Sequence, residues 1–403
     1  MVYIDNDNMD DIEILPRQHS FTNGSSASAS SYYDSSNLGM ENPYSFEWDE
    51  TIDYDYYEKR SLNKTKRLTD LQRQPKNTIV LVQERRHRNG PITNVIYRYG
   101  DLNQRTFALP KKSTFQKYRP LRFHPSFVDT SLTFSNHVNM LINPTYLYET
   151  LRRFMPKETV FIAVLHDPVK SFIVKLIKHP LLRKYKLKRR LNIMKKLVKR
   201  NKVFGDKFVN SIAFEFGKYG NHNLTTEEMI NRLKNQFHVV LMGEYLDESL
   251  VVLKNVLNWS LTDLVHVSKR INIDYTEIPS QIQDAIKKHN KLDQAIYDHF
   301  NSTFWKTVES YGLNFTADLK KFQSFNQKLA NYCRGSFGNL TNTEGHTVCT
   351  RMKWGDKEYV PYLKQKYQVM SNMELNSGLQ YLRNSLELYF NTTTKEIQRY
   401  LES

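Results

Sequence analysis

The hydrophobic and polar positions of this chain form short apolar runs separated by longer amphipathic stretches. Apolar runs at 79–82, 159–165 and 237–245 predict buried strands. A run that is apolar at successive positions leaves no solvent-facing side, which is typical of a parallel strand covered on both faces. Buried strands that alternate with helical patterns therefore predict an α/β fold, with a mostly parallel central sheet flanked by helices.

The first of these strands leads into a basic loop and then into a helix. From Ile92 to Tyr99, apolar residues recur at i, i+3, i+4 and i+7, which predicts a helix with one buried face. Gly90 or the asparagine before it can cap this helix, the proline that follows suits its first turn, and Gly100 can end it. The local pattern is thus strand, basic loop, helix.

A second turn of the same kind follows the strand at 159–165. Asp167 is expected to cap the next helix, and Pro168 is expected to open it. Helix N-termini that lie beyond the carboxyl ends of parallel strands favour anions, so the two turns together predict an anion-binding site. The alternative is that the first turn is an ordinary connection whose arginines face water. The cationic or titratable residues at the two turns are Arg85, Arg86, His87 and Arg88, and then His166, Lys170 and Lys175.

Shorter elements are expected between and after the buried strands. Residues 106–110 predict a short strand, and residues 132–134 predict another that ends at the pair Asn136 and His137. The remaining amphipathic patterns predict helices that begin at Asn143 and at Thr226, and helices at 246–259, 280–311, 315–333 and 376–401.

Three parts of the chain differ in composition. Residues 1–76 are polar and acidic, lack apolar periodicity, and are predicted to be disordered. Residues 77–333 carry the strand and helix patterns and form the expected folded domain. Residues 334–403 are expected to contribute a loop and a C-terminal helical extension.

The net charge of the chain indicates that its binding partner is anionic. The chain has 403 residues and a formal net charge of +16, which suits nucleic acid, an anionic membrane surface or an anionic small molecule. The basic segment 175–202 keeps an apolar stripe, so we interpret it as a helix with a solvated basic face. The alternative is a face turned toward an anion or a membrane surface. Because this segment lacks an aromatic platform, no nucleic-acid partner is expected.

Cysteine usage and hydropathy bear on the compartment. Cys333 and Cys349 fit no metal or redox motif, and they allow either a disulfide or two free thiols. No metal-ligand set is predicted. No apolar run approaches the ~18–20 residues that span a bilayer, and the N-terminus lacks a signal-peptide pattern. The chain is therefore expected to be soluble, or to have an anchor outside this sequence.

Several blocks resemble the galactose-3-O-sulfotransferases, a family that includes the galactosylceramide sulfotransferases. The two most specific blocks are GEYLDESLVVLKNVLNW, at 243–259, and LDQAIYDHFNSTFW, at 292–305. The segments TFALP, SNH and FMPKETVFIAVLHDPVKSF also match, and the blocks follow in the same order from about Asn77 to Cys333. By this comparison, residues 1–76 and the end after Cys333 are expected to lie outside the resemblance.

The resemblance implies a P-loop-like sulfotransferase fold. It implies transfer of a sulfuryl group from 3′-phosphoadenylyl sulfate, a co-substrate, to the 3-hydroxyl of galactose on a glycolipid or glycoprotein acceptor, with no metal. It also implies a location in the Golgi lumen and a type II membrane anchor.

The loop after the first strand departs from the family pattern. The family has a Lys-Thr-Gly-Ser-Ser type loop that holds the 5′-phosphosulfate. Here the five matching positions are Arg86, His87, Arg88, Asn89 and Gly90. A guanidinium can still neutralise an oxyanion, but the hydroxyl donors are gone, and an arginine in place of glycine can block close backbone approach.

The second turn departs as well. The family's 3′-phosphate site uses an arginine at the start of an Arg-Asp-Pro turn and a serine in the helix. These positions hold His166 and either Val174 or Lys175. His166 is cationic only part of the time near neutral pH, and Lys175 restores a charge without a planar bidentate grip.

Sulfuryl transfer needs a base, stabilisation of the leaving phosphate oxygen, and in-line positioning. His137 is the leading candidate for the base; the alternative is a structural histidine at a strand end. Glu244 is a second candidate, with a capping role as its alternative. Arg86 is the candidate for stabilising the leaving group, with Arg85 or Arg88 sharing the phosphate. If the altered motifs abolish turnover, the chain would instead be a catalytically inactive protein of this fold that binds a glycan or an anionic ligand.

Overall fold

The computed structural model describes part of the chain. The described residues are 2–4, 12–14, 74–84, 87, 90–118, 121–132, 138–144, 150–177, 185, 189–190, 192–193, 209–218, 224–267, 278–338, 348–375 and 401. Residues 1–69 and 70–403 form two separate compact units. In the first unit, β1 (Val2–Ile4) pairs antiparallel with β2 (Ile12–Ile14), so this part of the segment predicted to be disordered forms two short strands.

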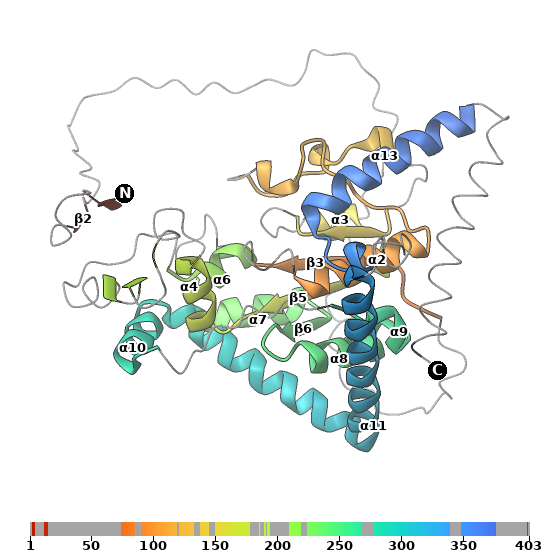
Figure 1. The fold of residues 1–403 in the computed structure, drawn as a ribbon. Coiled ribbons are helices and arrows are strands. Elements are labelled where there is room, and N and C mark those ends of the chain that lie inside the picture. Colours follow the sequence, from red (N-terminus) through yellow and green to blue (C-terminus); the bar gives the residue numbers. More distant parts are fainter. Residues whose placement is uncertain are drawn as a thin grey trace, which may run out of the picture. The chain divides into compact units, whose positions relative to one another are not determined.

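The second unit is built on a four-stranded parallel sheet (Figure 1). Its spatial order is β4 (Met140–Ile142), β3 (Ile79–Gln83), β5 (Val160–Leu165) and β6 (Val239–Met242). All residues of β3, β4 and β5 are buried, which is the pattern of a parallel sheet covered on both faces. The prediction of an α/β fold with a parallel central sheet flanked by helices is confirmed.

The strand order places a switch in direction between β3 and β5. From β3 the chain crosses to β4 on one side, and it then returns to β5 on the other side of β3. β3 and β5 pair over five positions, from Ile79 opposite Val160 to Gln83 opposite Val164. The turns that follow these two strands therefore leave the same edge of the sheet side by side.

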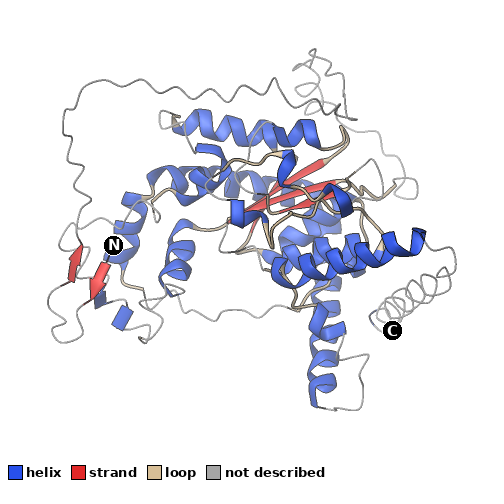
Figure 2. Ribbon diagram, turned by 90° about the horizontal axis from the view of Figure 1, so that it is seen from above, coloured by secondary structure: helices blue, strands red, loops and turns tan. Residues whose placement is uncertain are grey.

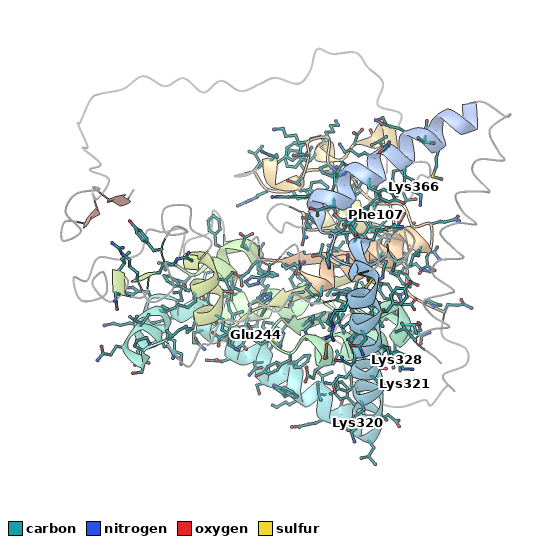
Figure 3. The ribbon with its side chains drawn as sticks, viewed as in Figure 1. Phe107, Glu244, Lys320, Lys321, Lys328 and Lys366 are labelled. Atoms are coloured by element: carbon teal, nitrogen blue, oxygen red, sulfur yellow. A yellow bond between two sulfur atoms is a disulfide. The ribbon has the colours of Figure 1, made fainter. Side chains whose placement is uncertain are left out.

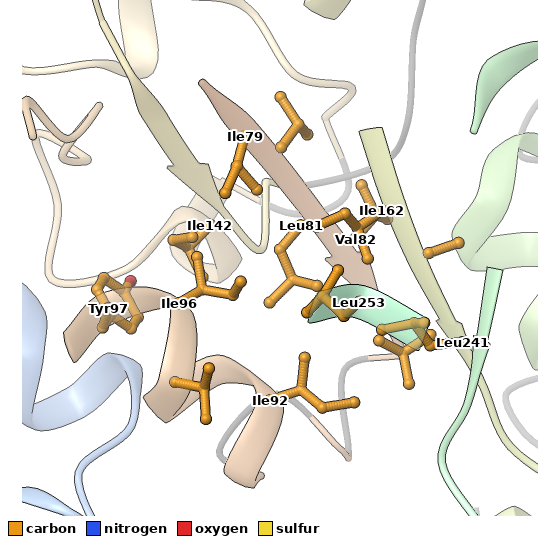
Figure 4. Packing of buried hydrophobic residues seen from close by; sticks show 14 of the residues in the cluster. Ile79, Leu81, Val82, Ile92, Ile96, Tyr97, Ile142, Ile162, Leu241 and Leu253 are labelled. Carbon is orange, nitrogen blue, oxygen red and sulfur yellow. The ribbon is translucent and has the colours of Figure 1, made fainter. Parts of the chain in front are cut away.

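Helices cover both sides of the strands (Figure 2). In the close view of the core, Ile96 of α2 (Pro91–Leu102) and Leu253 of α8 (Leu246–Leu257) point toward Leu81 of β3 (Figure 4). The other helices are α3 (Thr150–Phe154), α4 (Pro168–Ile177), α6 (Ser211–Ala213), η6 (Phe214–Lys218), α7 (Thr226–Gln236), α9 (Leu261–Leu264), α10 (Ser280–His289), α11 (Lys291–Gly338) and α13 (Asp356–Leu375).

Helix α2 begins at the predicted place but ends later than expected. Gly90 is its N-cap and Pro91 its first residue, whereas the helix continues through Gly100 to Leu102. Gly100 is buried inside the helix, and a Cβ atom there would overlap the ring of Phe107. The sequence pattern predicts that Gly100 ends the helix, whereas in the structure its missing side chain leaves room for the ring of Phe107 in the core.

The region between β3 and β5 differs most from the sequence prediction. Residues 106–110 form two isolated bridges, Phe107 with Met140 and Pro110 with Val128, in place of a strand. Leu132 ends a 3-10 helix, η4 (Thr130–Leu132), so the predicted strand at 132–134 is wrong at this residue. The strand of this region, β4, was not predicted, because three apolar residues give too short a pattern to separate a strand from a loop. Two further 3-10 helices, η2 (Phe115–Tyr118) and η3 (Pro125–Phe127), complete the region.

Helix α11 changes direction sharply at Gly312, whose φ of 60° and ψ of −144° lie outside the helical region (Figure 1). The predicted helix at 280–311 corresponds to α10 together with the first half of α11. The predicted helix at 315–333 corresponds to the second half of α11. The predicted helix at 376–401 and most of the basic segment 175–202 lie outside the described residues.

The segment 348–375 packs on the same core as the sheet. Cys349 forms a disulfide with Cys333 near the end of α11, which settles the two alternatives for the cysteines. Tyr359 and Leu363 of α13 are buried in the main hydrophobic cluster. Among the described residues, no helix combines the length and the apolar character needed to cross a bilayer.

This segment also covers the polar side of α2. The Asn94 side-chain amide donates to the carbonyls of Arg351, at 2.7 Å, and Trp354, at 2.9 Å. Asp101, a buried carboxylate, pairs with the guanidinium of Arg351 and with Lys366 Nζ at 2.7 Å. Because a buried charge is costly unless it is paired, these contacts fix the C-terminal segment against α2.

We predict that Gly100→Ala destabilises the protein by about 1–3 kcal/mol, because the new methyl group overpacks the site against Phe107. Helix propensity alone predicts the opposite, a gain of about 1 kcal/mol. Urea unfolding measures the change. In a Phe107→Leu background, the penalty of Gly100→Ala should shrink; an equal penalty in both backgrounds would contradict the packing argument.

Candidate functional site

The candidate site lies at the carboxyl ends of β3 and β5, where the strand order switches direction. In open α/β sheets, ligands bind in the crevice at this position. Glu84 and His87 follow β3, and His166 and Asp167 follow β5. The Glu84 side chain is buried, at 1 % exposure, whereas both histidines are partly exposed.

The two turns are in direct contact through their histidines. The rings of His87 and His166 stack with centroids 3.5 Å apart and planes inclined by 16°. The sequence predicted that both residues would face one anionic ligand. Their contact brings the two turns together, and it also means that two imidazoles fill the space between them.

A serine of α4 links the first turn to this helix. The Ser171 hydroxyl donates to Glu84 Oε1 at 3.1 Å, and His87 Nε2 lies 3.1 Å from the same hydroxyl oxygen. A hydroxyl has a single proton, so Ser171 must accept the hydrogen bond from His87 when it donates to Glu84. This arrangement assigns the proton of neutral His87 to Nε2 and leaves the lone pair on Nδ1.

A glycine sets the position of the second histidine. A Cβ atom at Gly243, the residue after β6, would overlap the imidazole of His166. The imidazole of His166 therefore lies against the backbone at the end of β6, and a side chain at position 243 would displace this ring.

The N-terminus of α4 is capped as predicted. Asp167 Oδ1 accepts from the backbone N–H groups of Val169, at 2.8 Å, and Lys170, at 3.0 Å. These two groups are thus already bonded to a carboxylate. An anion near this turn would have to be held mainly by side chains.

A small cavity of about 90 Å³ opens beside this cap. It is lined by Asp167, Val169 and Lys170 of the second turn, and by Ile278, Gln283 and Lys287 of the neighbouring segment and α10. This volume is well below the roughly 300–1,000 Å³ of ordinary ligand pockets, so it suits a single small group instead of a whole nucleotide.

Glu244, labelled in Figure 3, links the turn after β6 to the turn after β5. Its Oε1 accepts from the backbone N–H of Asp167 at 2.9 Å, and its Oε2 accepts from the Tyr297 hydroxyl at 3.4 Å. Burial raises the pKa of the Glu244 carboxyl from 4.5 to about 7, and the Asp167 charge adds to the rise while its N–H opposes it. The contacts are those of a carboxylate that positions Asp167, next to His166.

Several predicted residues lie outside the described part of the chain. These are Arg85, Arg86, Arg88, Asn89 and His137, and the side chain of Lys175 is also not described. Val174, one of two positions aligned with the family's serine, is buried in the core. The site predictions for the undescribed residues stay predictions. Of the described ones, His87 and His166 are in contact, Gly90 caps α2, and Lys170 lines the adjacent cavity.

Sequence comparison decides the family. A family model of galactose-3-O-sulfotransferases matches residues 51–391. The chain belongs to this family. The match extends beyond 77–333, so the expectation that residues 1–76 and the end after Cys333 lie outside the resemblance was wrong for residues 51–76 and 334–391.

Individual family members are distant. The chain is 26 % identical to the galactosylceramide sulfotransferase of Homo sapiens over 281 residues, which covers 64 % of each chain. It is 25 % identical to galactose-3-O-sulfotransferase 3 of Bos taurus over 286 residues, or 66 % of each chain. The chain thus spans a little under two thirds of the length of these two relatives. No solved structure matches it.

Sequence reasoning missed three polar residues of this family member's site. Ser171 and Lys287 gave no signal, because their partners come from distant segments. Glu84 directly follows the first strand, so the rule that sites lie beyond strand ends could have identified it. Together with the two histidines, Glu84 forms the one group of potential metal ligands among the described residues.

We predict that Glu244 makes the stability of this family member depend on pH. Between about pH 4.5 and pH 7, folded Glu244 keeps a proton that the unfolded chain has released, so the free energy of unfolding falls as pH rises through this window. In Glu244→Gln, the amide oxygen still accepts from Asp167 while the charge is gone. The variant should therefore gain stability relative to the wild type when the pH is raised from about 5 to about 8. The gain is at most about 3 kcal/mol, and it is measured as the difference in Tm between the two proteins at each pH. Equal differences at the two pH values would contradict the raised pKa.

Proposed function

We propose that the chain is a carbohydrate sulfotransferase. It would move a sulfuryl group from 3′-phosphoadenylyl sulfate to the 3-hydroxyl of a terminal galactose on a glycolipid or glycoprotein. The observation that carries this proposal is family membership across residues 51–391. The contact between the turns after β3 and β5 supports it, because a nucleotide with two anionic groups needs both turns within reach.

The proposed fold is the P-loop-like sulfotransferase type. The parallel order β4-β3-β5-β6, with a loop and helix directly after β3, is consistent with it. We also propose the Golgi lumen as the compartment. The Cys333–Cys349 disulfide favours an oxidising compartment of this kind.

In the proposed reaction, the galactose 3-oxygen attacks sulfur, and the bond from sulfur to the bridging phosphate oxygen breaks. The acceptor proton passes to a base, for which His137 remains our candidate. The leaving group is adenosine 3′,5′-bisphosphate, and Arg86 would stabilise its developing charge with Arg85 or Arg88. His87, Asn89 and Gly90 would complete the loop around the phosphosulfate.

The 3′-phosphate would lie near the second turn. His166 stands where the family has an arginine, so charge for this group must come from elsewhere. Lys170 and Lys287 both line the small cavity beside Asp167, and their positive charges would help to neutralise a phosphate bound there. Lys175 would add a further positive charge.

We predict that adenosine 3′,5′-bisphosphate stabilises the folded protein. At 100 times its dissociation constant, a bound nucleotide contributes about 2.7 kcal/mol, which appears as a higher Tm. The measurement is a melting curve with EDTA present. Absence of a shift at millimolar nucleotide would overturn the proposal and favour the catalytically inactive alternative, which binds a glycan or another anion.

We predict that Arg86→Ala lowers the rate of sulfate transfer to galactose-terminated glycolipid or glycoprotein by about 10²–10³-fold, the usual cost of one oxyanion contact. Labelled sulfate in the product measures transfer. The matched control is Arg153→Ala. Arg153 is an exposed arginine of α3, before the amino end of β5 and so at the opposite edge of the sheet. Equal activity of the two variants would remove Arg86 from the site.

A further inference from the structure

Sequons, which are asparagines in the sequence Asn-X-Ser/Thr, accept N-linked glycans in proteins of the secretory pathway. The chain has eight sequons, and three of them lie entirely within the described residues, beginning at Asn258, Asn301 and Asn314. A folded protein can carry a glycan only where the asparagine side chain reaches solvent and no packed group has to move. The structure therefore distinguishes between these three sequons.

The first two of them are partly built into the fold. Asn258 ends α8 in the left-handed conformation, with φ of 56°. The Ser260 hydroxyl of the same sequon caps α9 by accepting from the backbone N–H of Asp263 at 3.2 Å. Asn301 lies inside the first half of α11, and its side-chain oxygen is buried. Both asparagines are only partly exposed.

The third sequon lies at the corner of α11, directly after the kink at Gly312. Asn314 and Thr316 are exposed, whereas Phe315 between them is buried in the core and anchors the corner. Leu313 is 89 % exposed, and a Cβ atom at Gly312 would have no neighbour within 4 Å. Within the described part of the chain, the side chains of Asn314 and Thr316 make no hydrogen bond. The acceptor amide is therefore open to solvent.

This corner lies away from the candidate functional site. Helix α8 starts after the carboxyl end of β6, and at its other end the Leu257 carbonyl accepts from the backbone N–H of Lys76, just before β3. Lys254, in the last turn of α8, pairs at 2.7 Å with Asp318, about one turn after Asn314. The corner is therefore near the amino edge of the sheet, opposite the turns after β3 and β5. In Figure 1, it is the end of α11 that projects away from these strands.

We propose that Asn314 carries an N-linked glycan. In this modification, the side-chain nitrogen of Asn314 bonds to the anomeric carbon of an oligosaccharide. The bond from that carbon to the pyrophosphate of a lipid carrier breaks, and the amide loses one proton. The cell's oligosaccharyltransferase and its lipid-pyrophosphate oligosaccharide supply this reaction. The inference rests on the proposed function for the compartment, because the transfer takes place in the secretory lumen.

The test is mass spectrometry of the full chain, produced in a eukaryotic host behind a cleavable secretion signal. Peptide N-glycosidase in heavy-oxygen water should convert Asn314 to a labelled aspartate. Protein isolated from the cells that naturally make it should give the same labelled peptide. On a gel, Asn314→Gln and Thr316→Ala should each lack one glycan that the wild type carries.

The matched control is Thr316→Ser, which keeps a hydroxyl in the sequon and should retain the glycan. Because both positions are exposed, the variants should form the Cys333–Cys349 disulfide and should have the Tm of the wild type after enzymatic removal of glycans. An unmodified Asn314 in secreted, disulfide-bonded wild type or in the native protein would overturn the inference. So would a Thr316→Ala variant that keeps every glycan.

The proposed function is measured separately in the same samples. Adenosine 3′,5′-bisphosphate should raise the Tm of Asn314→Gln as much as that of the wild type, because the corner lies opposite the candidate site. A glycan on Asn314 without any nucleotide shift would support this inference and contradict the proposed function alone. A nucleotide shift in a protein that is unmodified at Asn314 would contradict this inference alone.

Discussion

The parallel pairing of β3 with β5 is the constraint on which the rest of the site depends. It aligns the two strands so that their carboxyl ends stop at the same level, and each end gives way to a turn and a helix. Two contacts of the corner follow from this alignment: the stacked imidazoles, and the serine that joins α4 to the first turn. The contact of Glu244 with Asp167 follows from the pairing of β5 with β6. A shift of one position in this register would separate His87 from His166.

A second constraint fixes the C-terminal part of the chain to the same core. Helix α2 is buried almost all round, although it carries the polar residues Asn94, Arg98 and Asp101 on the side away from the sheet. Arg98 donates to the carbonyls of Asp263 and Val265, and Asp101 pairs with Arg351 and Lys366. Because these groups need partners once buried, α9 and the segment 348–375 have to be present for α2 to pack. The extent of the family match, to residue 391, agrees with this.

The sequence predicted the strands at 79–82 and 159–165 and the helix starts after them well, since these are local patterns. The third predicted strand, at 237–245, is observed only over Val239–Met242, and its first two residues are partly exposed. The run at 159–165 and the pair Asp167 and Pro168 specify a strand, a cap and a helix within ten residues. It could not predict β4, whose three residues form a strand only because β3 supplies a partner. It also misread Gly100, because the reason for that glycine is Phe107, which contacts it only in the folded protein. The same distinction between local patterns and tertiary contacts holds for the candidate site. The sequence predicted the two turns, but it did not predict Ser171 and Lys287, since their roles arise from tertiary contacts.

The covalent bond between Cys333 and Cys349 has a practical consequence for anyone who makes this protein. It closes the connection between α11 and the segment that carries α13, and both sulfur atoms are buried in the core. A bacterial cytosol keeps thiols reduced, so material produced there would leave the far end of the chain held by side-chain contacts alone. Secretion, or refolding with a thiol–disulfide pair, is the sounder route to homogeneous samples for crystallisation and assays.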